Sequence, residues 1–178
     1  MVGAQIVTQL QSIVARNVDP LEAAVVSICQ FQGGHADNVI PHQARLVGTA
    51  RSLSAEVREL LELRVREVVE GTARLYGAWA DLSYKTGYPV LINDESRTAF
   101  ASAVAREIAG DGRVNDACAP MMAAEDFAYM LEERPGAFIF IGNGNSAGLH
   151  HPAYDFNDEA IAYGTSYWVR LVETALAG

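Results

Sequence analysis

The sequence predicts an α/β protein made of two parts, and three observations support this. Up to about residue 87, the hydrophobic pattern gives the order helix, strand, strand, helix, strand, whereas the remainder combines helices with a single apolar strand. Half of the 178 residues are hydrophobic, which is enough for a sizeable core. We therefore expect one domain over residues 1–87 and a second over residues 88–178.

The first predicted helix covers residues 2–16, because apolar residues recur there at helical spacing and Asn17, Asp19 and Pro20 end the pattern. The pattern begins directly after Met1, with no capping residue or strand before it. We therefore expect the chain to be part of a longer protein. The apolar stripe of this helix consists of Ile6, Val7, Leu10, Ile13 and Val14.

Two strands and a second helix are predicted next. Residues 24–31 are apolar and rich in β-forming residues, Gly33 and Gly34 end this run, and residues 43–51 alternate between two faces. Ser54 can then cap a helix, because its hydroxyl can accept a hydrogen bond from an amide of the first turn. The apolar stripe of this second helix is Val57, Leu60, Leu61, Val65, Val68, Val69 and Leu75.

Residues 79–84 alternate again and predict a third strand. One more strand before the first helix would complete the ferredoxin-like order β-α-β-β-α-β, in which two helices cover one face of an antiparallel sheet. We therefore expect the first part to be a ferredoxin-like α+β unit that lacks its first strand.

The second part is predicted to contain three helices and one strand. Asn93 and Asp94 cap a helix that runs to about Ile108, a short helix lies within residues 125–133, and residues 138–141 form a strand. A single strand would leave a parallel sheet without neighbours, which proteins normally avoid. The last helix has an apolar side formed by Ala160, Ile161, Gly164, Tyr167, Trp168, Leu171 and Val172.

The charge and cysteine content exclude several function classes. The 22 acidic and 13 basic side chains give a net charge of −9, which repels nucleic acid phosphates and anionic lipid. No apolar run approaches the roughly 20 residues needed to span a bilayer. Cys29 and Cys118 are far apart, and no signal segment precedes them. We expect a cytoplasmic protein without nucleic acid or membrane partners.

Two motifs in the glycine-rich loop suggest functions that their context does not support. Residues 144–148 match the G-x-S-x-G pattern around a nucleophilic serine, here Ser146, and residues 142–147 approach a dinucleotide-binding fingerprint. Both patterns require a helix to start at once, and Pro152 opposes one. A turn after a strand is the favoured interpretation, and we expect no labelling of Ser146 by a fluorophosphonate.

A histidine pair, His150 and His151, lies shortly before the last predicted helix. An imidazole can bind a metal ion, but a catalytic zinc site needs about three protein ligands. The remaining histidines and cysteines show no ligand spacing. From the residues alone, His150 is either a metal ligand or a loop histidine that is hydrogen-bonded to the backbone.

Four motifs in order resemble the metal-dependent aminoacylase and carboxypeptidase family, in particular its hippurate hydrolase and indoleacetyl-amino-acid hydrolase branch. They are GGHADNVIP at 33–41, GTAR at 48–51, AEDFAYML at 124–131 and GLHHPAYDFND at 148–158. The similarity covers essentially the whole chain. It implies that residues 1–87 are a lid and dimerisation domain, and that residues 88–178 are the C-terminal part of a metallopeptidase-like α/β catalytic domain.

The resemblance also implies roles for three residues. His150 matches the last metal ligand of the family, while His151 lies where other polar residues are tolerated. Asn38 and Arg51 match lid positions that reach substrate in the partner subunit, where an amide can hold a carbonyl oxygen and a guanidinium can hold a carboxylate through two hydrogen bonds. The alternatives are a turn residue for Asn38 and a solvated strand end for Arg51.

The implied reaction is hydrolysis of an N-acyl amino acid, such as hippurate, to a carboxylic acid and an amino acid. Two divalent ions (Mn, Zn, Co or Ni) would activate water, a glutamate would transfer its proton, and the enzyme would be a homodimer. The other four metal ligands and this glutamate have no counterpart in the sequence, so we predict no catalytic residue. The chain alone is expected to bind metal weakly and to be inactive, and the alternative is a non-catalytic dimerisation module.

Overall fold

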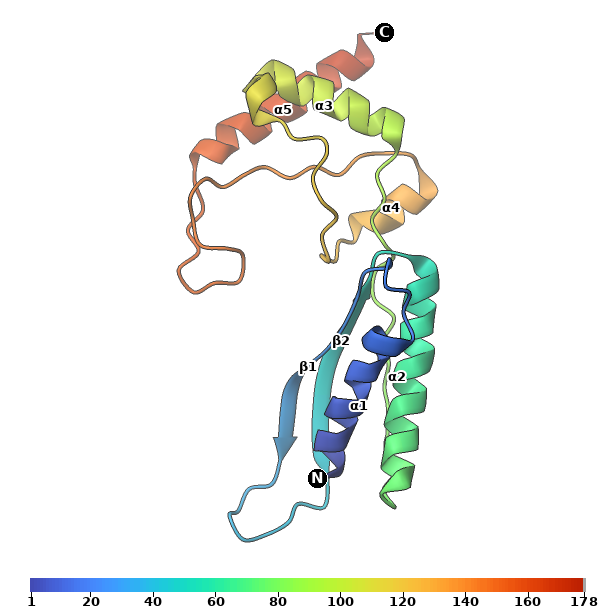
Figure 1. Cartoon of the computed structure of the whole chain (residues 1–178). Helices are drawn as coiled ribbons and strands as arrows, with labels where there is room; N and C mark the ends of the chain where they lie inside the picture. The colour runs from blue at the N-terminus through green and yellow to red at the C-terminus, as the bar shows by residue number, and fades with distance from the viewer. Residues whose placement is uncertain (178) are drawn as a thin grey trace. The chain divides into compact units, whose positions relative to one another are not determined.

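The computed structural model describes residues 1–177, which form two compact units. The first unit contains Met1–Val90 and Pro120–Ala124, and the second contains Leu91–Ala119 and the residues from Glu125 onward. The return of residues 120–124 to the first unit was not predicted from the sequence. The predicted α/β class is confirmed, with several helices and a small sheet (Figure 1). The assignment of the two parts to a lid and a catalytic domain stays a prediction.

The first unit begins with four regular elements in the predicted order. They are α1 (Val2–Arg16), β1 (Ala24–Gly33), β2 (Ala44–Ser52) and α2 (Ala55–Leu75). The strands form an antiparallel sheet, and both helices pack beside it (Figure 1). The bounds of the helices follow their end signals, since the Ser54 hydroxyl accepts a hydrogen bond from the amide of Val57 at 3.3 Å.

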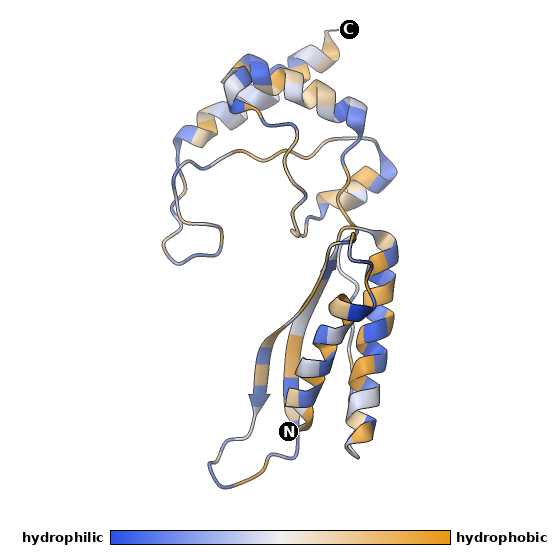
Figure 2. Cartoon of the chain, in the orientation of Figure 1, coloured by the Kyte–Doolittle hydropathy of each residue, from blue (hydrophilic) through white to orange (hydrophobic). Residues whose placement is uncertain are grey.

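The core of the first unit lies between the sheet and its two helices. The apolar stripe of α2 faces this core, and hydrophilic residues, blue in Figure 2, occupy most of the remaining surface of the helix. Leu75 is an exception to the predicted stripe, because its side chain is 78% exposed at the end of the helix. The buried core residues are Ile6, Leu10, Ile13, Val18, Val26, Val57, Leu61, Val65 and Val69.

The predicted third strand at residues 79–84 is not formed. Its alternation is real, because Ala80, Leu82 and Tyr84 pack against the core while the residues between them are exposed. Within the described chain, however, these six residues make no hydrogen bond to another backbone segment. Alternation reports which side chains are buried, whereas a strand also requires a neighbour to pair with.

The second unit consists of helices joined by long loops. Its elements are α3 (Glu95–Ala109), the short 3₁₀ helix η1 (Asp111–Arg113), α4 (Phe127–Glu133) and α5 (Glu159–Leu176). Helices α3 and α5 pack against each other. None of the helices that the structure describes, in either unit, has the length and apolar character needed to cross a bilayer.

Asp94 is the N-cap residue of α3, as its position in the sequence predicts. Its carboxylate accepts hydrogen bonds from the Ser96 hydroxyl at 2.6 Å and from the Arg97 amide at 2.9 Å. These two bonds, the one from Ser96 first, lower the pKa of Asp94 from its ordinary value of 3.8. The charged form of this side chain is therefore favoured in the folded protein.

The predicted strand at residues 138–141 is also not formed. The backbone of Phe138 is bound by the Asn93 side chain instead, which donates to the Phe138 carbonyl at 2.9 Å and accepts from its amide at 2.8 Å. Next to this pair, the amide of Asp94 donates to the carbonyl of Gly136 at 2.9 Å. A side-chain amide thus supplies the donor and acceptor that a neighbouring strand would supply.

Candidate functional site

The loop that carries the histidine pair is closed at its base by two side chains, which we call the clasp. The side-chain nitrogen of Asn143 donates to the backbone carbonyl of Asp155 at 2.6 Å. The side-chain oxygen of Asn143 accepts from the backbone amide of Asn157 at 2.7 Å. The Ser146 hydroxyl donates to the same Asp155 carbonyl at 2.9 Å and is 3.2 Å from the Asp155 amide. The clasp holds the two ends of the loop together, so it limits the positions that the histidines can take.

The clasp also gives Ser146 of the G-x-S-x-G motif a structural role. The hydroxyl of Ser146 is bound to the backbone of Asp155, and no helix begins after it until Glu159. A nucleophilic serine would need a helix at once and a base beside its hydroxyl. The structure therefore supports the turn interpretation over the serine hydrolase interpretation.

His150 and His151 lie side by side in the sequence but differ in what they can bind. The Nδ1 atom of His151 accepts a hydrogen bond from the Ala153 amide at 3.0 Å, so a neutral His151 ring carries its proton on Nε2. His150 is exposed and forms no hydrogen bond with any residue the structure describes. Of the two rings, His150 is therefore the one that is free to bind a ligand from outside the loop.

The backbone of His150 is unusual. Its φ angle is +68°, and it is the sole non-glycine residue with positive φ among residues 1–177. Non-glycine residues adopt this left-handed conformation at a cost, and such residues are enriched at functional sites. The strained backbone and the free imidazole coincide at the residue that the resemblance identifies as a metal ligand.

The described residues do not form a metal site by themselves. No group of three or more histidine, cysteine, aspartate or glutamate side chains gathers in residues 1–177 in a way that could hold an ion. One imidazole provides a single donor, whereas catalytic sites of zinc type need about three. The donor set therefore does not fit a complete metal centre.

Arg51 lies near the end of β2, where it pairs with Val25 of β1. Its guanidinium Nη1 donates to the carbonyl of Met122 at 2.5 Å, which ties this arginine to the segment 120–124 of the same unit. A guanidinium has five N–H donors, so the remaining ones are sufficient for a carboxylate. Sequence reasoning missed Met122, because a contact through a backbone carbonyl leaves no signal in residue type.

Asn38 lies in the exposed loop 34–43 that joins β1 to β2. Gly34 opens this loop with φ at +80°, a conformation that glycine adopts without strain. Asn38 lies in a turn of this loop, as the alternative interpretation expects, and its side-chain amide makes no hydrogen bond with the described residues.

The structure does not bring Asn38 and Arg51 together. The loop precedes Ala44, the first residue of β2, and Arg51 lies seven residues further along the strand. At about 3.3 Å per residue, this strand separates Arg51 from the loop by roughly 23 Å. The two residues that the resemblance links to one substrate thus lie at opposite ends of the hairpin.

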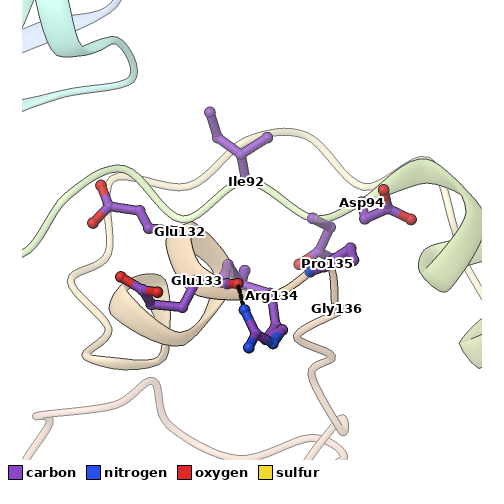
Figure 3. A pocket seen from close by; sticks show the side chains of 9 residues that line it. Ile92, Asp94, Glu132, Glu133, Arg134, Pro135 and Gly136 are labelled. Carbon is purple, nitrogen blue, oxygen red and sulfur yellow. Dashed lines mark hydrogen bonds between the residues drawn. The ribbon is translucent and has the colours of Figure 1, made fainter.

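A surface cavity of about 350 Å³ lies elsewhere in the second unit (Figure 3). It is lined by Ile92, Asn93, Asp94 and residues 131–136, and none of the predicted site residues contributes to it. Asn93 and Asp94 are already engaged in hydrogen bonds, and Arg134 donates to the Glu133 carbonyl at 2.7 Å, as the dashed line shows. The cavity is therefore not the predicted substrate or metal site.

The chain is similar to curated hydrolases of about twice its length. It is 37% identical over 166 residues to the hippurate hydrolase of Campylobacter jejuni, an alignment that covers 93% of this chain and 43% of that enzyme. It is 38% identical over 170 residues to the N-acetyldiaminopimelate deacetylase of Geobacillus sp. (strain WCH70), with 96% and 45% covered. The chain thus spans less than half the length of these relatives.

A solved structure gives the same relationship. The YXEP protein of Bacillus subtilis, described as a dinuclear metal binding peptidase from the M20 family, superposes with a TM-score of 0.73 at 32% identity, covering 99% of this chain and 45% of that one. The model of peptidase family M20/M25/M40 matches residues 4–174. These findings confirm the resemblance to metal-dependent aminoacylases and carboxypeptidases, and the chain belongs to peptidase family M20/M25/M40.

Proposed function

We propose that this chain is the substrate-holding part, with one metal ligand, of an amidohydrolase that cleaves N-acyl amino acids. Two relatives support the substrate class, because hippurate hydrolase and N-acetyldiaminopimelate deacetylase are both named for removal of an acyl group from an amine. The observation that supports the proposal most directly is the conformation of His150. Its backbone is strained, and its imidazole has no hydrogen-bond partner among the described residues.

Each proposed residue has a chemical role that its surroundings permit. The free N–H groups of Arg51 bind the carboxylate of the amino acid part of the substrate, and the contact with Met122 orients the guanidinium. The amide of Asn38 donates to the carbonyl oxygen of the scissile bond, where negative charge develops. His150 supplies one donor to a divalent ion (Mn, Zn, Co or Ni), and the remaining ligands come from outside the described residues.

The separation of Asn38 from Arg51 supports a homodimer. A small N-acyl amino acid cannot bridge about 23 Å of strand. If both residues contact substrate, one site takes Asn38 from one copy of the chain and Arg51 from the other, so only one of them reaches into the partner's site, whereas the resemblance implies that both do. A two-fold dimer contains two such sites, and each of them needs both copies.

The first experiment tests the inactivity of the isolated chain. The purified protein is incubated with Mn²⁺ or Zn²⁺ and hippurate, and released glycine is measured. We expect the same background for the chain and for its His150→Ala variant, because one donor does not complete a catalytic site. Turnover that depends on His150 would show that the described residues suffice, against the proposal.

The second experiment tests the roles of Asn38 and Arg51 in a full-length protein. A chimaera is made in which residues 4–174 replace the matching part of the Campylobacter jejuni enzyme, and its hippurate hydrolysis is the reference. The Asn38→Ala and Arg51→Ala chimaeras are each expected to be strongly impaired. Arg51→Lys should recover little, because an ammonium cannot replace the planar two-donor fork.

Mixed dimers then decide whether the site is shared. When the Asn38→Ala and Arg51→Ala chimaeras pair at random, half of the dimers contain one copy of each, and one of the two sites in each such dimer has both residues intact. About a quarter of the unsubstituted activity should therefore return. No recovery above the single variants would mean that both residues act from the same copy, or that one of them does not contact substrate.

A non-catalytic dimerisation module is the second candidate. The first unit has an ordered core of its own, which is sufficient to present an interface without chemistry. Light scattering of the isolated chain measures its mass, and hippurate binding is followed by the NMR signals of Arg51. A stable dimer whose Arg51 signals do not respond to hippurate would favour this module.

A further inference from the structure

The loop before α5 contains two tight turns that share one residue, His151. In the first turn, the His151 amide donates to the Gly148 carbonyl at 3.1 Å. In the second turn, the Tyr154 amide donates to the His151 carbonyl at 2.9 Å. His151 is therefore the last residue of one turn and the first residue of the next, and both of its backbone groups are hydrogen-bonded.

The first turn requires an uncommon backbone conformation at His150. Leu149 and His150 are its two central residues, and of these only His150 has a positive φ, at +68°. A central pair in which only the second residue has positive φ is typical of a type II turn, where that residue is usually glycine or asparagine. A larger side chain destabilises the left-handed conformation, because its Cβ lies close to the following carbonyl oxygen. Contacts outside His150 must therefore hold this turn.

The second turn suits its residues and has an additional hydrogen bond. Pro152 is its second residue, where the fixed φ of proline is favourable, and proline also keeps the preceding His151 in an extended conformation. The Nδ1 atom of the His151 ring accepts from the Ala153 amide at 3.0 Å. Asparagine and aspartate side chains bind the amide two residues ahead in the same way in Asx turns.

The clasp begins directly after the second turn, at Asp155. Hydrogen bonds thus hold the backbone of this loop at each step from Gly148 to Asn157. The His150 ring makes no hydrogen bond with the residues that the structure describes. The bonds of the neighbouring residues therefore fix the backbone from which this ring extends.

We propose that His151 is a positioning residue for the His150 imidazole. The bond from the Ala153 amide to Nδ1 fixes the orientation of His151, whose own amide closes the first turn. The closed turn keeps His150 left-handed, so its imidazole extends from one defined backbone conformation. What this imidazole binds rests on the proposed function, whereas the conformation of the loop does not.

Two substitutions of His151 in the 178-residue chain test the role of Nδ1. Asparagine places an acceptor oxygen near the position of Nδ1, whereas glutamine places its polar group one bond further from the backbone. In His151→Gln, we expect the protection of the residue 151 amide against exchange, relative to the unfolded rate of the same residue, to fall about fivefold, the factor that one hydrogen bond typically supports. His151→Asn should keep this protection.

NMR couplings measure the φ angle of residue 150 in the same variants. Full protection of the residue 151 amide together with a positive φ at residue 150 in His151→Gln would overturn the proposal, because the turn would then close without the ring bond.

A glycine at position 150 tests whether the ring bond opposes backbone strain. Glycine adopts positive φ without strain, so a turn with glycine there needs less support from its neighbours. We expect the double variant His150→Gly and His151→Gln to recover at least the protection of the unsubstituted chain at the residue 151 amide. A double variant as poorly protected as His151→Gln would contradict the proposed link between the two histidines.

The Campylobacter jejuni chimaera separates this inference from the proposed function. His151→Gln should lower kcat for hippurate about fivefold with KM unchanged, because the residue positions a group that does not hold the substrate. His151→Asn should restore kcat. An unchanged kcat in His151→Gln would overturn the positioning role, whereas an inactive unsubstituted chimaera would count against the proposed function and leave the exchange result standing.

Discussion

Substitution of Gly48 by alanine is expected to destabilise the first unit, and the structure explains the sign. Gly48 begins the GTAR motif and lies opposite Ile28, next to the bulge between Ile28 and Gln30. A Cβ atom at this position would be 2.4 Å from the Ser27 carbonyl oxygen and 2.8 Å from the Ile28 Cδ1. The Ile28 side chain can move, but the carbonyl belongs to the paired backbone, so the strands must shift.

The loss of stability follows from the overlap between the added Cβ atom and the Ser27 carbonyl oxygen. Forced displacement in a packed structure typically costs about 1–3 kcal/mol, and we expect Gly48→Ala to lower the free energy of unfolding of the first unit by that amount. Gly71→Ala is the matched control, because its Cβ would meet nothing within 4 Å in α2. Removal of a helical glycine should stabilise the same unit by about 0.5–1 kcal/mol.

Urea unfolding measures both variants, with NMR signals of Leu10 in the first unit and Val104 in the second unit as separate probes. The Leu10 transition should move to lower urea in Gly48→Ala and to higher urea in Gly71→Ala, while the Val104 transition stays in place. If Gly48→Ala unfolds at the same urea concentration as the unsubstituted chain, the close approach of β1 to β2 at this point is refuted.

Three further predictions concern packing, pH and the loop. Leu61→Ala should cost the first unit about 2–5 kcal/mol in urea unfolding, whereas Leu63→Ala on the exposed side of α2 should cost less than about 0.5 kcal/mol. The pKa of Asp94 is lower in the folded protein than its ordinary value of 3.8, so the charged carboxylate stabilises the second unit above pH 3.8. This stabilisation is lost as the pH falls through the folded pKa, and the acid unfolding of the Asp94→Asn variant should lack this loss of stability. Ser146→Ala should speed amide exchange at Asp155, and an unchanged exchange rate would show that the clasp does not hold the loop.

The helices were predictable from the sequence because their signals are local. Residues 2–16 and Ala55–Leu75 follow from apolar spacing and from end signals such as Ser54, which the structure confirms. Leu75 shows the limit of this reasoning, since it continues the apolar spacing and yet is 78% exposed. Periodicity identifies a side of a helix, but it does not show how far the neighbouring core extends along it.

The two predicted strands failed for a non-local reason. Residues 79–84 and 138–141 have the composition of strands, but pairing depends on a second segment that the local pattern does not contain. At Phe138 the side chain of Asn93 replaces part of that neighbour, and at residues 79–84 nothing in the described chain does. The predicted cap role of the Asn93–Asp94 pair thus divides between two residues, with Asp94 capping the helix and Asn93 binding Phe138.

The candidate site shows the same contrast between local and distant information. Asn38 and Arg51 are close in sequence, and the resemblance links them to one reaction. A hairpin reverses this relation, because every residue of β2 between the loop and Arg51 moves them further apart, to roughly 23 Å. Because an extended strand lies between them, these two residues do not reach one small substrate within one copy of this chain, although they are close in sequence. If both residues contact one small substrate, the pairing of two copies is a geometric requirement, and the mixed-dimer experiment tests that requirement without any assumption about the metal.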